Sequence, residues 1–233
     1  MTLVIRTTDS VTSPARGSKV LPVLANVSGV LSRFHADYFV GADNAATGDV
    51  WPDLVGEYHL RRVGAVALTE DTTTGGKRTV ELIGTGTLQS LEFVTFPSAF
   101  TIGVRIQVTA NPSSHKGIFY TTTAGGGLLG MSWGGYGAFG STGAAYPSGA
   151  AVAKPAWVTV VGVFDQAGGN GKIVTNGTTV SSTQDWTGMP TNRFYRMSGD
   201  GYAAGLRVRQ VVVLDHAADA DETTALTSAL TTD

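Results

Sequence analysis

Alternation of apolar and polar side chains is the clearest pattern in the chain, and it is concentrated in residues 99–215. From Phe100 to Val108 nearly every second residue is apolar, and Trp157–Asp165 repeats the pattern. A period of two puts successive side chains on opposite faces of a β-strand. The glycine-rich segment Ala167–Gly171 then leads into Lys172–Asn176, which predicts a hairpin.

Shorter apolar segments bounded by glycine, proline or asparagine predict further strands. They are expected at residues 64–68, 79–83, 90–95, 117–122, 128–133, 136–140, 178–182, 193–197 and 205–214. A different spacing, typical of one face of a short helix, relates Leu24, Val27, Val30, Leu31 and Phe34. Many short strands without an internal repeat predict an all-β sandwich of antiparallel sheets.

The first twenty residues differ from the rest of the chain. Residues 1–20 are polar, contain Pro14 and Gly17, and show no apolar period beyond a short strand candidate at Thr2–Arg6. Such a segment cannot form a core by itself. We expect an extended N-terminal arm that is either loose or laid on a partner, followed by one domain over residues 21–233.

The C-terminus changes from a strand pattern to a helix pattern. Asp219 is a suitable helix N-cap, and Glu222 follows it three residues later. Leu226 and Leu230 then fall on one helical face. These features predict one short closing helix.

Charge and cysteine content exclude several classes of protein. The chain has 16 Lys and Arg against 18 Asp and Glu, a net charge of −2, and no cysteine. It therefore has no basic field for a nucleic-acid backbone, no thiol nucleophile and no cysteine-ligated metal. No apolar run approaches the roughly 18 residues of a membrane span, and the N-terminus does not resemble a signal peptide.

Catalytic patterns are missing as well. Retaining glycosidases need two carboxylates about 5 Å apart, yet no Asp or Glu occurs between Glu92 and Asp165. The histidines stand outside metalloprotease and hydrolase motifs; they are His35, His59, His115 and His216. We expect a protein that is not an enzyme.

A resemblance is carried by the hairpin and by two flanking motifs. Trp157–Asp165, its glycine turn and Lys172–Gly177 resemble the corresponding hairpin of concanavalin A-like lectin/glucanase (laminin-G-like) domains. The ending at residues 205–231 is similar to the same family. Trp51–Gly56 is similar to the lead-in of such domains in bacteriophage minor tail and other virion proteins. The resemblance covers residues 24–231 and implies a jelly-roll β-sandwich of two antiparallel sheets.

The resemblance leaves two functions open, because this fold carries many functions. The first is a structural protein of a virion, a phage minor tail or capsid decoration protein anchored by residues 1–20. Its partners would be other virion proteins and copies of itself, and it would be made in the host cytoplasm. The alternative is a glycan-binding module that recognises carbohydrate on the host cell surface.

Candidate binding residues follow from these alternatives. Exposed aromatic side chains near glycine could hold a sugar, although they could equally be part of the core. The candidates are Trp133, Tyr136, Phe139, Trp186 and Tyr202. A possible calcium site combines oxygen ligands from a single loop. Its residues, which could instead cap turns, are Asp43, Asn44, Asp49 and Asp53.

Overall fold

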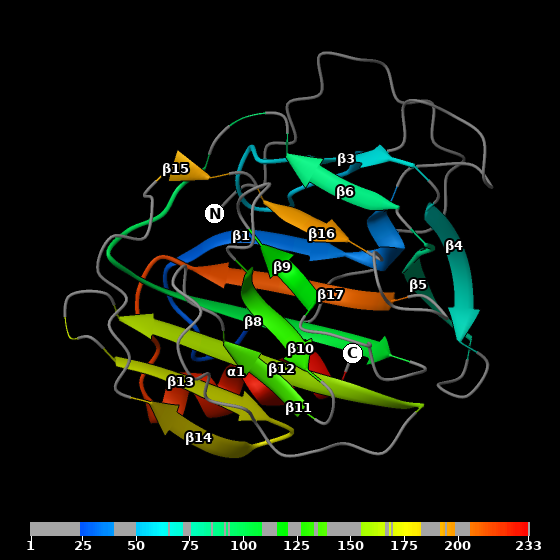
Figure 1. Ribbon diagram of the computed structural model, residues 1–233. Coiled ribbons are helices and arrows are strands. Elements are labelled where there is room, and N and C mark those ends of the chain that lie inside the picture. The colour runs from blue at the N-terminus through cyan, green and yellow to red at the C-terminus, as the bar shows by residue number, and fades with distance from the viewer. Residues whose placement is uncertain are drawn as a thin grey trace.

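A computed structural model gives the structure of the chain (Figure 1). It describes residues 24–39, 50–64, 66–71, 76–84, 86–90, 92, 94–108, 116–120, 127–132, 135–138, 155–165, 168, 170–182, 192–193, 195–198 and 206–232. These residues form mainly β-strands, with one short 3-10 helix, η1 (Ala36–Tyr38), and one α-helix, α1 (Ala220–Thr232).

The larger sheet has eight strands, paired antiparallel. Seven of them lie in the order β14 (Thr178–Ser182), β13 (Asn170–Thr175), β12 (Ala156–Asp165), β8 (Ala99–Val108), β17 (Leu206–Leu214), β5 (Lys77–Leu82) and β4 (Val66–Asp71). The eighth, β1 (Val30–His35), pairs with the second half of β17, and β5 pairs with its first half. One edge of β17 therefore pairs with two different strands, one along each half of its length.

The second sheet has seven shorter strands, also paired antiparallel. Their order is β11 (Gly135–Ala138), β10 (Gly127–Ser132), β9 (Lys116–Tyr120), β16 (Arg196–Ser198), β6 (Thr87–Ser90), β3 (Leu60–Val63) and β2 (Val50–Trp51). A separate ladder joins β15 (Asn192–Arg193) to β7 (Val94–Thr95). The expectation of an all-β fold built from antiparallel sheets is confirmed.

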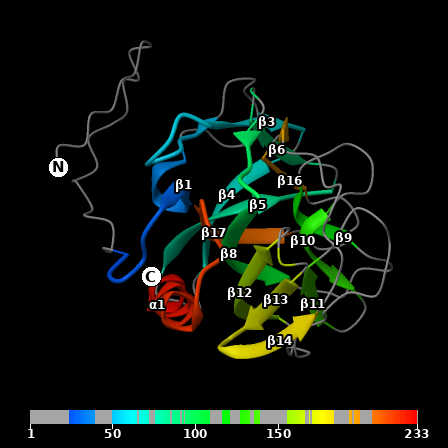
Figure 2. The ribbon, with the colours of Figure 1, turned by 90° about the vertical axis from the view of Figure 1, so that its left-hand side faces the viewer.

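The main hydrophobic core lies between the two sheets (Figure 2). Alternate residues of β8 from Phe100 to Val108 are fully buried in it, as their period predicts. Phe100 stacks on Phe164 of β12 with 4.7 Å between ring centroids. The second sheet contributes Trp51, Leu60, Leu88 and Met197. Side chains from both layers thus share one core.

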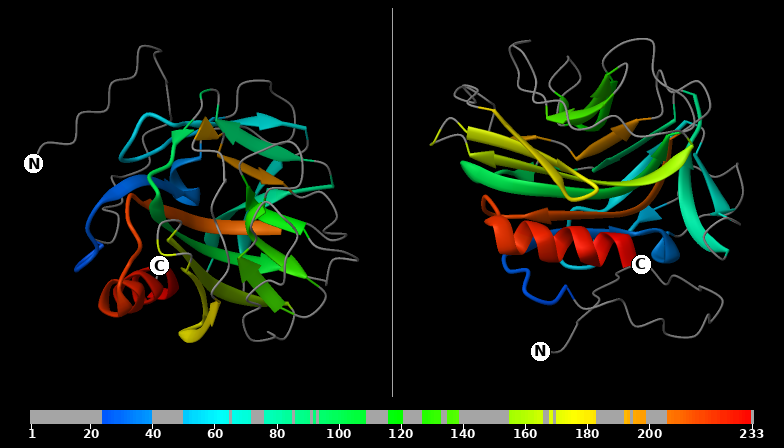
Figure 3. Two further views of the ribbon diagram at one scale, coloured as in Figure 1. Left: turned by 60° about the vertical axis from the view of Figure 1, so that its left-hand side comes forward. Right: turned by 90° about the horizontal axis from the view of Figure 1, so that it is seen from below.

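A smaller core lies on the opposite face of the eight-stranded sheet. Leu226 and Leu230 of α1 pack there with Val161 of β12 and Val212 of β17. Figure 3 shows the helix lying against this sheet, on the side away from the second sheet. The central strands are therefore apolar on both faces where the helix covers them.

The start of α1 is fixed as its sequence predicts. Asp219 caps the helix, because its Oδ1 accepts the Glu222 N–H at 2.9 Å. Just before the cap, Thr101 Oγ1 accepts the Ala218 N–H at 2.9 Å and donates to the His216 carbonyl. The helix therefore begins beside the N-terminal part of β8, at Thr101.

The helix expected from the spacing of Leu24 to Phe34 is wrong, because residues 30–35 form strand β1. Phe34 is buried in the main core, and Ser32 faces the same core two residues earlier. The Ser32 hydroxyl bonds the Tyr195 hydroxyl at 3.2 Å, so a polar residue occupies an inward position. Because Ser32 is polar, the sequence of β1 shows no clear alternation of apolar and polar residues. Pairing with β17 makes this segment a strand.

Two sequence-based expectations stay predictions. Residues 1–20, the expected arm, lie outside the described residues, and the jelly-roll strand connection is an expectation drawn from the resemblance. Within the part of the chain that the structure describes, no helix has the length and apolar character needed to cross a membrane.

A side chain at Gly103 of β8 should displace the helix. A Cβ there would lie 2.8 Å from Leu230 Cδ1 and 3.0 Å from Leu226 Cδ2. We expect Gly103→Val to lower the free energy of unfolding by about 1–3 kcal/mol through overpacking, and Gly103→Ala to lower it less. Chemical denaturation measures both values, and equal stability of all three proteins would contradict close packing of α1.

Candidate functional site

The aromatic candidates fall mostly outside the described residues. Trp133, Phe139, Trp186 and Tyr202 lie there. Tyr136 belongs to β11, the edge strand of the second sheet, where its Cα pairs with Met131. The glycan site predicted on these five residues therefore stays a prediction.

Of the four calcium candidates, the structure describes Asp53. Its Oδ1 accepts backbone N–H groups of Arg33, Val55 and Gly56 at 3.0–3.1 Å. This carboxylate thus ties the turn after β2 to β1, as Asp does in many turns. Asp43, Asn44 and Asp49 lie outside the described residues. Among those described, no group of three or more His, Asp or Glu is placed to hold a metal ion.

A charged cluster joins β17, α1 and the segment before β1. His216 Nδ1 lies 2.9 Å from Asp215 Oδ1, and its Nε2 lies 2.7 Å from Glu222 Oε2. The other oxygen of Glu222 accepts the backbone N–H and the hydroxyl of Ser28, at 3.0 and 2.7 Å. Gly29 fits beside the cluster with φ of +54°, where a Cβ would lie 2.1 Å from Asp215 Oδ1.

The contacts in this cluster shift the pKa of its members in opposite directions. Hydrogen bonds from Ser28, and then from His216, lower the pKa of Glu222 from 4.5 to about 2. Hydrogen bonds to Asp215 and Glu222 raise the pKa of His216 above 6.5. Each shift favours the charged form of its group.

This cluster is not arranged as a hydrolase triad. A triad needs a histidine nitrogen that accepts the proton of the serine hydroxyl. Here the Ser28 hydroxyl donates to Glu222, and both His216 nitrogens face carboxylates. We therefore assign the cluster a structural role, which is to fasten the start of α1 to the sheet.

The cluster should stabilise the fold in a limited pH window. The His216 contribution is present below pH 6.5 and is lost as pH rises through the raised pKa, whereas the Glu222 contribution is lost as pH falls from 4.5 towards 2. We expect His216→Gln to lower the Tm most between about pH 4.5 and 6.5. Thermal unfolding from pH 3 to 9 measures this difference. A difference that does not change with pH would contradict the charged cluster.

The helix covers only part of the outer face of the eight-stranded sheet. Thirteen helical residues span about 20 Å, whereas the ten residues of β8 span about 33 Å. Near its end, Thr231 Oγ1 lies 2.9 Å from Thr159 Oγ1 of β12. Thr159 pairs with Arg105 of β8, so these two residues lie side by side at the end of the helix. The next row of outward-facing residues across the sheet, two positions further along each strand, lies past the helix.

That next row is polar and contains one aromatic ring. Trp157 of β12 pairs with Gln107 of β8, Gln107 pairs with Arg207 of β17, and Arg207 pairs with Glu81 of β5. Directly paired residues share a face of the sheet. Together with Arg105, these residues form what we call the tryptophan surface.

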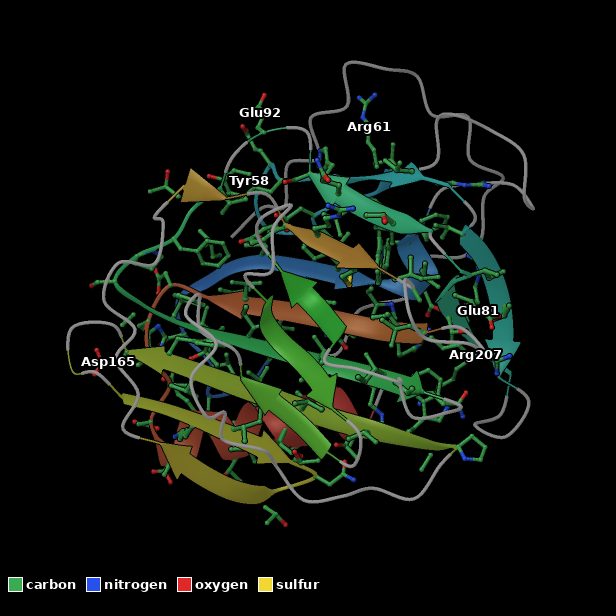
Figure 4. All side chains as sticks on the ribbon, viewed as in Figure 1. Tyr58, Arg61, Glu81, Glu92, Asp165 and Arg207 are labelled. Carbon is green, nitrogen blue, oxygen red and sulfur yellow. The ribbon has the colours of Figure 1, made fainter. Side chains whose placement is uncertain are left out.

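Contacts within the tryptophan surface hold its side chains in place. The Arg105 guanidinium lies 5.9 Å from the Trp157 ring centroid and donates to Thr159 Oγ1 at 3.2 Å. Arg207 donates to Gln107 Oε1 at 3.3 Å, and its Nε lies 3.4 Å from Glu81 Oε1. Figure 4 shows the Arg207 and Glu81 side chains together at the side of the molecule where β5 pairs with β17.

The tryptophan surface has the composition of a ligand site. Binding sites combine an aromatic or apolar wall with a few fixed polar groups. Trp157 and Arg105 are both half-buried, so each keeps part of its side chain accessible. The alternation of Trp157–Asp165 already puts Trp157 on the face of Thr159, but only strand pairing shows that Arg105 and Gln107 lie beside it.

Comparison with known sequences identifies no family. No protein-family model matches the chain, and no curated protein matches it.

Solved structures do resemble it. Trypanosoma rangeli sialidase in complex with 2,3-difluorosialic acid aligns with a TM-score of 0.62 and 14% identity, over 88% of this chain and 33% of the sialidase. The binding domain of botulinum neurotoxin DC in complex with SialylT aligns with a TM-score of 0.63 and 12% identity, over 89% and 52%. The receptor binding domain of botulinum neurotoxin mosaic serotype C/D gives 0.63 and 12%, over 86% and 50%.

These likenesses establish the fold and no more, because identity is low. The chain spans about a third of the sialidase and about half of each toxin domain. None of these three proteins is a phage protein, so they do not support the expected bacteriophage family.

Proposed function

We propose that the protein is a glycan-binding module without catalytic activity, and that it binds sugar on the tryptophan surface. The observation that carries this proposal is a half-buried tryptophan on a strand, next to an arginine and just past the end of the covering helix. An indole ring offers a flat apolar face to the C–H groups of a pyranose. The neighbouring guanidinium groups supply hydrogen-bond donors for sugar hydroxyls, and the buried Gln107 holds Arg207 in place.

The position of these groups favours binding. They project from the adjacent strands β8, β12 and β17, and strands hold a site more rigidly than loops do. Arg207 is further held by Glu81 and Gln107. Little conformational entropy is then lost when a ligand binds.

The solved structures support the proposal by analogy of fold. A botulinum toxin binding domain is in complex with SialylT, and the sialidase is in complex with a sialic acid derivative. The same comparison includes an enzyme, so the chemistry of the surface has to separate binding from hydrolysis. Most glycoside hydrolases use two carboxylates that flank the glycosidic bond, whereas sialidases use a tyrosine nucleophile. The tryptophan surface contains one carboxylate, Glu81, which is paired with Arg207, and it contains no tyrosine.

Removing the ring should remove binding. We expect Trp157→Ala to weaken binding to the glycan that an array identifies by at least about tenfold, because a central tryptophan contributes most of the energy of such a contact. Trp157→Phe, which keeps a smaller ring, should lose less. Isothermal titration measures affinity, and circular dichroism checks that the variants fold.

The Trp133 prediction from the sequence supplies the competing outcome. If Trp133→Ala abolishes binding while Trp157→Ala leaves it unchanged, the glycan lies at the β10–β11 hairpin and the assignment to the tryptophan surface is wrong. If the wild-type chain binds no glycan on the array, the proposed function itself is wrong.

We further propose, from the resemblance of Trp51–Gly56, that the module is displayed on a virion and held there by residues 1–20. A glycan-binding face would then meet the host cell surface. Sedimentation of the full chain and of residues 21–233 tests the arm. An oligomer that becomes a monomer on truncation is expected, and the same state for both proteins would contradict a role of the arm in self-assembly.

A further inference from the structure

Arg105 differs from the other arginines on and near this face of the sheet. On β17, Arg207 lies 3.4 Å from Glu81, and Arg209 lies 2.7 Å from Asp37. Arg105 lies on the neighbouring strand β8, and no described Asp or Glu forms an ion pair with it. Its guanidinium contacts the Thr159 hydroxyl and the Trp157 ring. The positive charge of Arg105 is thus uncompensated within the part of the chain that the structure describes.

Partial burial makes this charge unfavourable in the free protein. The loss of water around the guanidinium that makes the charge unfavourable also lowers the pKa of Arg105. A cation withdrawn from water is stabilised when an anion supplies both charge and hydrogen-bond acceptors. Nη1 of Arg105 is held by Thr159, so the orientation of the guanidinium is fixed before any ligand arrives.

We infer that the glycan bound on the tryptophan surface is anionic, and that Arg105 binds its carboxylate or sulfate group. The inference rests on the proposed function, because the sugar ring is taken to lie on Trp157. A guanidinium presents parallel N–H donors that match a planar carboxylate and also suit a sulfate. Because Arg105 lies against the Trp157 ring, an acidic substituent on a stacked pyranose is within its reach.

Pairs of glycans in which an acidic group is present or is blocked or absent test this inference. The probes are trigalacturonic acid and its methyl ester, sialyllactose and its methyl ester, and dextran sulfate and dextran, each titrated by calorimetry. We expect the wild-type protein to bind the anionic member of at least one pair about tenfold more tightly than the neutral member, as charge-assisted hydrogen bonds do. The preference should weaken with added salt. The carboxylated and sulfated pairs distinguish the two sources of negative charge.

Matched arginine variants assign the effect to Arg105. Arg105→Gln should reduce the preference for the anionic glycan to about twofold or less while binding of the neutral glycan persists. Arg105→Lys should restore part of the preference, because it keeps the charge without the planar donors. Arg61→Gln makes the same change in net charge on β3 of the other sheet, where Arg61 is exposed and well separated from Arg207 (Figure 4). It should keep the full preference.

Each alternative outcome has a definite meaning. Equal binding of both members of every pair by the wild-type protein would overturn the inference and leave the proposed function standing. No binding of any probe would overturn both. An equal loss in Arg61→Gln and Arg105→Gln would show that net charge, and not Arg105, sets the preference. A Tm of Arg105→Gln close to that of the wild type shows that folding is not the cause.

Discussion

Helix α1 is shorter than the strands it covers, and this difference in length determines how the rest of the structure is organised. Where the helix lies, the strands carry apolar residues on the outer face as well as on the inner one. Val161 and Val212 are two of these outer residues, and they pack with the helix. At one residue there, Gly103, a side chain would press on Leu226 and Leu230 of the helix. From the end of the helix onward the same strands turn polar on that face, with Arg105 and Gln107 on β8. The end of the helix thus sets the border between the apolar, covered part of this face and the tryptophan surface, where Trp157 and Arg105 are half-buried.

The position of that border depends on how the helix is fastened at its other end. Asp219 caps the first turn, and Glu222 reaches both His216 and Ser28. A reciprocal capping box would have used the Glu222 carboxylate within the helix. Here that carboxylate instead bonds the segment before β1, so the two ends of the described chain hold the helix in register. A helix shifted by one turn, about 5 Å, would cover or uncover the row of Trp157.

The sequence alone predicts the elements whose signal is local. The period of two in β8 and the cap of α1 each depend on residues close in the chain, and both are found. Strand β1 could not be predicted in this way, because Ser32 faces the core and is satisfied by Tyr195, which is 163 residues away. The tryptophan surface was missed for a related reason. Trp157 and Arg105 come together only through the pairing of β12 with β8.

Two arginines on neighbouring strands of the eight-stranded sheet differ in how deeply they are buried and in whether a carboxylate pairs with them. Arg209 is almost fully buried, and it donates two hydrogen bonds to the Asp37 carboxylate, at 2.7 and 3.3 Å. Such a closed pair leaves nothing for a ligand, and loss of either partner would leave a buried charge. Arg105 is only half-buried and is held by a hydroxyl and a ring, neither of which neutralises it. A charge oriented in advance but left uncompensated stabilises an anionic complex more than it stabilises the free protein, which is the condition for selective binding.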